Sequence, residues 1–255
     1  MHASIAHFDF GYPWWLSYGH IVFLIPAVAA LIVGRTRKWT RWPMLLLGAL
    51  ALWSAAGLVA LRAFDINGRP VLPTQSFFRS GNGRVLDIGA GTGRSSIMVL
   101  EARPQATLVA LDQFGQSFES HFGRPGPTPQ QRLLANLKAA GVDQRAAIET
   151  ADMRKLPFEN NTFDAVVSAY AVDHLRRDGV KQALAEAARV MKPGSEFLLM
   201  LVANDGWVKL AFGPILGHGG TRGPGWWSER VKEAGFETLE TGTAPATLYF
   251  LLRRP

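Results

Sequence analysis

Two long apolar segments dominate the N-terminal third of the chain. Residues 16–34 and 43–61 contain no Lys, Arg, Asp or Glu. Each segment has 19 residues and would extend about 28 Å as a helix, close to the thickness of the hydrocarbon layer of a bilayer. Pro26 lies inside the first segment, where a proline is expected to kink or break a helix. The pattern predicts a hairpin of two transmembrane helices within residues 1–62.

Aromatic and basic residues border these segments as they do at membrane interfaces. The aromatic residues stand at both ends of the hairpin: Tyr12, Trp14, Trp15 and Tyr18 at one end, Trp39 and Trp42 at the other. The loop between the segments carries four basic residues, and residues 62–84 carry four more. Positive-inside counting therefore leaves the orientation of the hairpin open, and also whether it spans the bilayer or dips into one leaflet. The alternative, a buried helical hairpin of a soluble protein, would need an unusually dry core.

From residue 83 onward, short apolar runs alternate with amphipathic segments. Runs such as VLDI and FDAVV are apolar on both faces, as parallel strands between two helix layers are. The alternation predicts an α/β fold with a Rossmann-like, seven-stranded sheet. Its last strand is expected to be antiparallel, because the connection at Ala244 and Pro245 is too short for a helix. The predicted strands are 84–88, 107–112, 145–150, 163–169, 195–202, 236–241 and 247–252, and the helices 92–102, 128–140, 176–190 and 226–234. We expect residues 63–82 to be a linker and residues 83–255 to be the domain.

Composition and charge narrow the classes of function. The chain of 255 residues has no cysteine, which excludes disulfides, cysteine-ligated zinc, iron–sulfur clusters and a catalytic thiol. We assign no metal-binding residues. The net charge is +7, and residues 1–84 hold eight of the 27 Lys and Arg but only two of the 20 Asp and Glu. Because the positive charge lies beside the most apolar segments, it favours a membrane surface over nucleic acid as the partner.

A glycine-rich sequence, VLDIGAGTGR, follows the first predicted strand. Gly89, Gly91 and Gly93 lie between the strand and a helix, where glycine permits a tight turn and close approach of a ligand. The dinucleotide fingerprint would need glycine at position 94, which is Arg94. Asp87 at the end of the strand disfavours a pyrophosphate and favours a cationic ligand. S-adenosylmethionine has an amino group and a sulfonium, so its charge matches.

Two further carboxylates follow the next two strands. Asp112 stands where an acidic residue binds both ribose hydroxyls of a nucleoside. Asp152 could accept the exocyclic amine of adenine, with Met153 against the ring. We also assign Gln113 and Ser168, beside the ends of the second and fourth strands, to cofactor binding. A single Asp at such a place is more often a turn or cap residue, but three at successive strand ends favour one shared site.

Together these motifs resemble the class I S-adenosylmethionine-dependent methyltransferases, and in particular the ubiquinone/menaquinone C-methyltransferase-like group. The resemblance rests on VLDIGAGTGR, on LVALD, on the D-x-x-x-L-P-F-x-x-x-x-F-D run at 152–164 and on ARVMKPGSEFLLM at 188–200. It covers roughly residues 83–205 and does not include the hairpin. It implies S-adenosylmethionine as cofactor and methyl transfer to a small molecule, which in that group is a quinone, sterol, phospholipid, thiol or other compound.

The resemblance also indicates where the acceptor would lie. The loop after the fourth strand, where the family places acceptor-facing groups, contains Asp173 and His174. Histidine is the natural general base near neutral pH. Alternatively, Asp173 caps the following helix and His174 is solvated. Two long loops, 113–127 with Phe118, His121 and Phe122, and 204–225 with His218, are expected to complete the acceptor site as lids.

The sequence thus predicts a membrane-anchored S-adenosylmethionine-dependent methyltransferase. Its acceptor would be a hydrophobic small molecule of the quinone, phenol, lipid or thiol class, and membrane lipid would be a second partner. The catalytic domain would face the cytoplasm, where the methyl donor is made. One alternative is a nicotinamide-dependent Rossmann oxidoreductase, which Arg94 and Asp87 disfavour. The other is a membrane-tethered, non-catalytic nucleotide-binding module.

Overall fold

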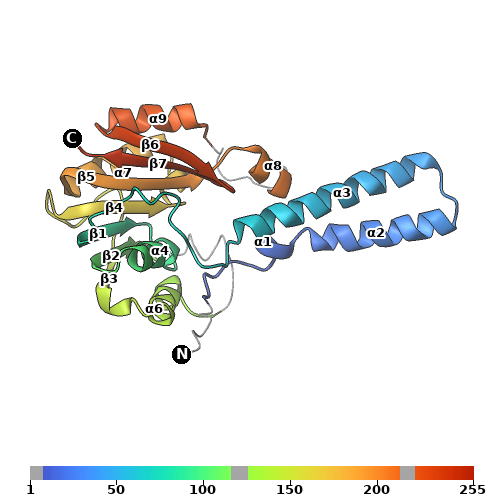
Figure 1. Ribbon diagram of the computed structural model, residues 1–255, viewed down its shortest axis with the longest axis horizontal. Coiled ribbons are helices and arrows are strands. Elements are labelled where there is room, and N and C mark those ends of the chain that lie inside the picture. The colour runs from blue at the N-terminus through green and yellow to red at the C-terminus, as the bar shows by residue number, and fades with distance from the viewer. Residues whose placement is uncertain (1–7, 116–125, 213–221) are drawn as a thin grey trace. The chain divides into compact units, whose positions relative to one another are not determined.

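Seven strands form one mixed sheet (Figure 1). They lie in the order β3-β2-β1-β4-β5-β7-β6; β1 to β5 are parallel, and β7 is antiparallel to both of its neighbours. The predicted seven-stranded sheet with an antiparallel last strand is confirmed. The bounds are β1 Gly83–Ile88, β2 Ala106–Asp112, β3 Ala146–Thr150, β4 Phe163–Ala169, β5 Met191–Val202, β6 Glu237–Ala244 and β7 Thr247–Arg253.

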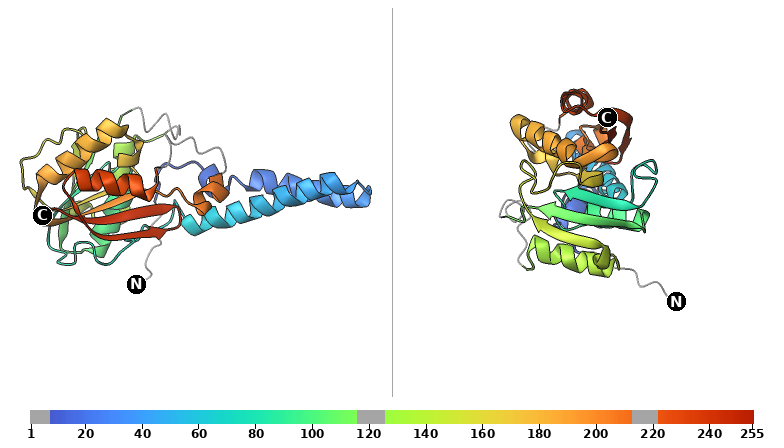
Figure 2. Two further views of the ribbon diagram at one scale, coloured as in Figure 1. Left: turned by 90° about the horizontal axis from the view of Figure 1, so that it is seen from above. Right: turned by 90° about the vertical axis from the view of Figure 1, so that its left-hand side faces the viewer.

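The order of the strands and helices indicates where a ligand of this sheet would bind. Helix α4 (Arg94–Ala102) contacts α6 (Pro129–Ala139), and α7 (Arg177–Val190) contacts α9 (Pro224–Glu233). The crossovers from β1 to β2 and from β4 to β5 run in opposite directions along the sheet, so right-handed connections put α4 and α7 on opposite faces (Figure 2). Ligands of such sheets bind beyond the carboxyl ends of the strands where the connections diverge, here between β1 and β4. Two short 3-10 helices, η1 (Asp143–Arg145) and η2 (Val172–His174), complete this part.

The computed structural model describes residues 8–115, 126–212 and 222–255. The chain divides into two compact units. The sheet unit consists of Met1–Gly11, Gly68–Asn204 and His218–Pro255, and the hairpin unit consists of Tyr12–Asn67 and Asp205–Gly217. Most of the predicted N-terminal segment thus forms a unit of its own, whereas Phe8–Gly11 belong with the sheet.

The hairpin unit contains α1 (Trp15–Tyr18), α2 (Ile21–Thr36), α3 (Arg41–Phe64) and α8 (Gly206–Phe212). Helices α2 and α3 run antiparallel and contact each other along the hairpin (Figure 1). The first predicted helix is divided at Gly19 and His20, whereas α2 continues through Pro26. Buried His20 contacts the carbonyl oxygen of Ala211 through Nε2, which ties α8 to this unit.

The lengths of these helices bear on the predicted membrane spans. Among the described residues, only α3 is long and apolar enough to cross a membrane. Helix α2 has 16 residues, about 24 Å, which is less than the hydrocarbon thickness. The first predicted transmembrane helix, residues 16–34, is therefore not confirmed by the structure.

The predicted linker is largely an ordered part of the sheet unit. Helix α3 extends to Phe64, and the chain from Gly68 onward packs beside the sheet. Arg69 donates to both carboxylate oxygens of Glu101 at 2.8 Å. The guanidinium of buried Arg103 donates to the carbonyl oxygens of residues 75, 77 and 78.

Candidate functional site

The glycine-rich loop between β1 and α4 is the meeting point of three loops. Gly89 has a φ of +76°, and a Cβ on it would collide with Ala171, which follows β4. The same Cβ would lie 3.3 Å from Cε of Met153, which follows β3. At the other end of the loop Gly93 has a φ of +95° and faces Leu133 of α6. The backbone here requires glycine both for its conformation and for lack of space.

Asp112 ends β2 with its carboxylate held at the edge of the sheet. Oδ2 accepts the N–H of Gly91 at 2.9 Å, and Oδ1 accepts the N–H of Phe114 at 3.0 Å. Each oxygen therefore has one backbone partner and keeps a further lone pair for a ligand hydroxyl. Gln113 beside it is exposed. The structure thus joins the predicted ribose-binding acid directly to the glycine loop.

Asp87 is fully buried and its carboxylate points into the first turn of α4. Both oxygens accept from Ser95 Oγ, at 2.9 and 2.7 Å, and Oδ2 also accepts from Ser96 Oγ at 2.6 Å. Burial raises the pKa of Asp87 to about 7, although the two serine hydroxyls act in the opposite direction. Near neutral pH this group carries only part of a negative charge. Attraction of a cationic ligand therefore depends less on Asp87 than the sequence suggests, and its direct contact with the cofactor stays a prediction.

Asp152 is engaged by a neighbour along the chain. Its carboxylate accepts the backbone N–H of Arg154 at 2.8 Å and the Nη2 of the same residue at 2.6 Å. These hydrogen bonds lower the pKa of Asp152. The adenine amine would have to share this carboxylate with Arg154 or displace it. Ser168 is buried, and its hydroxyl donates to the carbonyl oxygen of Ile88 at 2.7 Å, so it connects β4 to β1.

The loop after β4 carries the predicted acceptor-side residues. Asp173 does not cap α7, whose N-cap is Arg176; its Oδ2 accepts the N–H of Val202 at the end of β5 at 3.1 Å. His174 ends η2 and is exposed. Tyr170 has a φ of +55°, an uncommon conformation for an aromatic residue, and its hydroxyl lies 2.5 Å from Oγ1 of Thr247.

Several residues at this edge escaped the sequence reasoning. Ser95 and Ser96, two and three residues after Gly93, hold Asp87, and a serine pair at a helix start is a signal that could have indicated this. Arg154 lies two residues after Asp152, a spacing that permits the observed ion pair. Of the predicted lids, Phe118, His121, Phe122 and His218 lie outside the described residues. Part of the second predicted lid forms α8 instead of a loop.

The family model for a methyltransferase domain matches residues 86–199. A ubiquinone/menaquinone biosynthesis C-methyltransferase from Bartonella tribocorum is 33% identical over 122 residues, covering 48% of this chain and 42% of that protein. A sterol 4-C-methyltransferase from Caenorhabditis elegans is 28% identical over 130 residues, covering 49% and 34%. The chain spans about half the length of the curated relatives it matches, or less.

Solved structures agree on the fold. The structure of an O-methyltransferase family protein from Burkholderia thailandensis has a TM-score of 0.56 and 14% identity, covering 92% of this chain and 70% of that one. Together with the family match, the comparisons identify the matched region as a methyltransferase domain that uses S-adenosylmethionine. They favour this identification over the oxidoreductase alternative.

The residues at the edge of the sheet fit this cofactor. Ala171 occupies the direction in which a Cβ of Gly89 would point, so glycine lets the loop pack closely against the segment that follows β4. Asp112 offers anionic oxygens in a fixed orientation, which suit the two ribose hydroxyls. Met153 supplies an apolar surface beside the glycine loop. These groups come from the loops after β1, β2 and β3, which lie next to one another in the sheet.

Proposed function

We propose that the protein is a membrane-anchored methyltransferase that transfers the methyl group of S-adenosylmethionine to a lipophilic small molecule of the quinone, phenol, lipid or thiol class. The observation that carries the proposal is the presence in one chain of the methyltransferase domain and of a helical hairpin with an apolar outer surface. The domain supplies the chemistry, and the hairpin supplies access to the compartment where such acceptors dissolve.

The outer surface of the hairpin supports an anchor in lipid. Leu46 and Leu52 of α3 are 72% and 73% exposed, and Trp42 is 65% exposed. Further exposed large apolar side chains, less exposed than these three, recur along both long helices: Val22, Phe23, Ile25, Val28, Ile32, Val33, Leu45, Leu50 and Val59. A continuous apolar surface of this kind marks an interaction with a membrane or a partner. The buried positions between the helices include Ala27, Gly34, Gly57 and Ala60, and small residues are common where membrane helices pack.

The ends of the hairpin favour a bilayer as the partner. Helix α3 has 24 residues, about 36 Å, enough to cross the hydrocarbon layer with its ends in the interface. Exposed tryptophans mark both ends, Trp14 and Trp15 before α2 and Trp39 and Trp42 at the turn. The turn is also basic, with exposed Arg35, Arg37, Lys38 and Arg41, as suits contact with anionic headgroups. The sheet unit would face the cytosol, where the methyl donor is made.

The residues of the sheet unit would bind and align the reactants. The cofactor supplies an electrophilic methyl group on a sulfonium. Asp112 would bind the ribose hydroxyls, and the glycine loop would let the backbone approach the nucleoside. Rate acceleration would come mostly from alignment and exclusion of water. His174 is the candidate general base when the acceptor is a phenol or hydroquinone, which must lose a proton.

The acceptor class draws support from the names of the relatives, which include quinone and sterol C-methyltransferases. Both kinds of acceptor partition into lipid. An enzyme held at the bilayer would meet them at a high local concentration.

The test is methyl transfer in vesicles. The full-length protein in phospholipid vesicles, given isotopically labelled methyl donor, is offered a hydroquinone, a sterol, a phenol, a thiol and the phospholipid itself. We expect label in at least one lipophilic acceptor, and much less label at the same donor concentration when the Asp112→Ala variant replaces the unaltered protein. Absence of label in every acceptor, from a protein that binds the donor, would overturn the proposed activity in favour of a non-catalytic module.

The anchor is tested separately by flotation with vesicles. Replacing Leu46 and Leu52 by Lys places two charges on the outer surface of α3 and should release the protein from the floating fraction. Leu239→Lys in β6 is the matched control, because Leu239 is also exposed but lies in the sheet unit. Equal flotation of all three proteins would contradict the role of the hairpin as anchor.

A further inference from the structure

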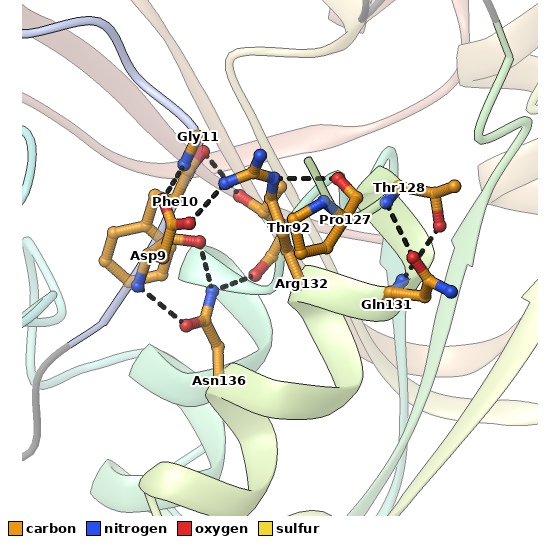
Figure 3. Close-up of polar contacts among 9 residues, drawn as sticks. All are labelled: Asp9, Phe10, Gly11, Thr92, Pro127, Thr128, Gln131, Arg132 and Asn136. Carbon is orange, nitrogen blue, oxygen red and sulfur yellow. Dashed lines mark hydrogen bonds and ion pairs between the residues drawn. The ribbon is translucent and has the colours of Figure 1, made fainter. Parts of the chain in front are cut away.

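The segment that precedes the hairpin is bound to the sheet unit (Figure 3). Phe10 is fully buried and Phe8 nearly so. Between them, Asp9 pairs with the side-chain amide of Asn136 in α6: its N–H donates to Oδ1 at 2.9 Å, and its carbonyl oxygen accepts from Nδ2 at 3.0 Å. Asn136 is itself buried and thereby satisfies both backbone polar groups of one residue, much as a neighbouring strand would.

The same amide also reaches the glycine loop. Nδ2 of Asn136 donates to the carbonyl oxygen of Thr92 at 2.9 Å, so one side chain joins the N-terminal segment and the loop. From the other side, the hydroxyl of Thr92 donates to the carbonyl oxygen of Phe10 at 3.1 Å. Thr92 is thus held through both its backbone and its side chain.

An ion pair completes the attachment. The carboxylate of Asp9 binds the guanidinium of Arg132 in α6, whose side chain is only 7% exposed. Nε of Arg132 donates to the carbonyl oxygen of Pro127 at 3.0 Å, and the other carboxylate oxygen of Asp9 accepts the N–H of Gly11 at 2.9 Å. A buried guanidinium without its carboxylate would be costly, so the pair favours the attached segment.

We propose that Phe8–Gly11 and Asn136 form a clamp that positions the glycine loop for the cofactor. The inference rests on the proposed use of S-adenosylmethionine. Thr92 lies next to Gly91, whose N–H is already bonded to Asp112, the proposed ribose-binding acid, so the clamp and Asp112 hold two adjacent residues of the loop. A loop that is ordered before binding loses less conformational freedom when the ligand arrives, and affinity rises accordingly. Asn136 acts through Thr92 and is a positioning residue.

The test compares two substitutions on the same helix in the full-length protein. Asn136→Ala removes the bonds to Asp9 and Thr92. Gln131→Ala is the matched control, because among the described residues Gln131 forms the capping box with Thr128 and no bond to the clamp, so its loss should weaken α6 alone. We expect Asn136→Ala to raise the Kd for S-adenosylmethionine, measured by calorimetry, about tenfold, since the lost hydrogen bonds order the loop. At saturating donor, kcat should change little. Gln131→Ala should lower the melting temperature and leave the Kd unchanged.

A second variant and a second readout separate positioning from mere structure. Thr92→Val keeps Asn136 but removes the hydroxyl that holds Phe10, and it should weaken donor binding in the same direction. Amide exchange at residues 8–11 should slow when S-adenosylhomocysteine is added to the unaltered protein, and much less in Asn136→Ala. An unchanged Kd in Asn136→Ala would overturn the clamp alone. No donor binding by the unaltered protein would overturn the proposed function, and with it the clamp.

Discussion

Asp87 and Asp112 lie at the carboxyl ends of adjacent parallel strands, but their carboxylates have different surroundings. The carboxylate of Asp112 is held at the edge of the sheet by two backbone N–H groups, whereas that of Asp87 is enclosed by Ser95 and Ser96. Arg94, which breaks the dinucleotide fingerprint, also has a structural place: its guanidinium lies 5.4 Å from the centre of the Phe10 ring and donates to the carbonyl oxygen of Gly68 at 3.0 Å. The surroundings of these residues thus separate Asp112, the candidate ribose-binding acid, from groups that hold the loop.

Asp112→Ala should weaken binding of S-adenosylmethionine at least tenfold with the fold retained. Hydrogen bonds to a charged partner contribute roughly 1.5–3 kcal/mol each, and the ribose would lose two of them. Calorimetry gives the affinity, and circular dichroism checks the fold. The Asp112→Asn variant keeps the shape of the side chain but not its charge, and its affinity for the donor should lie between those of the unaltered protein and the alanine variant. Unchanged affinity in the alanine variant would remove Asp112 from the ribose site.

The raised pKa of Asp87 predicts how stability depends on pH. Because the folded-state pKa is about 7 and the ordinary value is 3.8, the folded state retains a proton between these pH values that the unfolded state has lost. The free energy of unfolding should therefore fall as pH rises from about 4 to about 7, by an amount on the order of 4 kcal/mol. Asp87→Asn removes this titration. In thermal unfolding between pH 4 and 8, the melting temperature of the variant should rise relative to that of the unaltered protein as pH increases. If the two melting temperatures change with pH in the same way, Asp87 does not have the raised pKa.

Most elements of the sheet unit follow from local pattern, because each is marked by its own residues. Strand β4 occupies the predicted range 163–169, and α7 begins one residue after the predicted start at 176. Helix α8 could not be predicted in the same way, because residues 204–225 are glycine-rich and the helix packs through Ala211 against Ala60 and Leu61 of α3. The clamp was equally hidden, since Asp9 and Asn136 are 127 positions apart and neither has a local signal. Whether Asp87 is exposed or buried depends on the direction of its side chain, and the spacing of the motif residues along the sequence does not define that direction.

At the scale of elements, the turn between β1 and α4 should tolerate no side chain at Gly89. Gly89→Ala adds the cost of a left-handed conformation and a collision with Ala171, so we expect loss of donor binding and a destabilisation of roughly 1–3 kcal/mol or more. Gly194→Ala is the matched control: Gly194 has a φ of +77°, and no described atom lies within 4 Å of its added Cβ. The control should show the conformational cost in thermal unfolding and keep its affinity for the donor. Equal affinities in both variants would count against the glycine loop as the cofactor site.

For the whole molecule, the hairpin is an insertion between two segments of the sheet unit rather than an extension at its end. The chain leaves the sheet unit after Gly11 and returns at Gly68, and Arg94 touches Phe10 on one side and Gly68 on the other. The segments of the sheet unit that precede and follow the hairpin therefore both contact the guanidinium of Arg94. Removal of the hairpin alone differs from removal of everything before residue 68, because the second change also removes the clamp.

This difference yields a paired deletion experiment. A protein in which a short Gly-Ser linker replaces residues 12–67 should dissolve without detergent and bind S-adenosylmethionine, although α8 loses its partner helix. A protein that begins at Gly68 should bind the donor at least tenfold more weakly, since the buried pocket of Phe10 is empty and Arg132 has lost Asp9. Calorimetry on both proteins provides the comparison. Equal affinities would show that the N-terminal segment is dispensable for the cofactor.

The attachment of Asp9 to α6 also sets an order of events during synthesis. Residue 9 leaves the ribosome long before Asn136 exists, and at roughly 5–20 residues per second the interval is on the order of ten seconds. If the hairpin enters the bilayer as proposed, it has time to do so before Asn136 is made. Asp9 would then bind α6 only after the hairpin is inserted, and the proposed clamp would close on a protein that is already at the lipid surface.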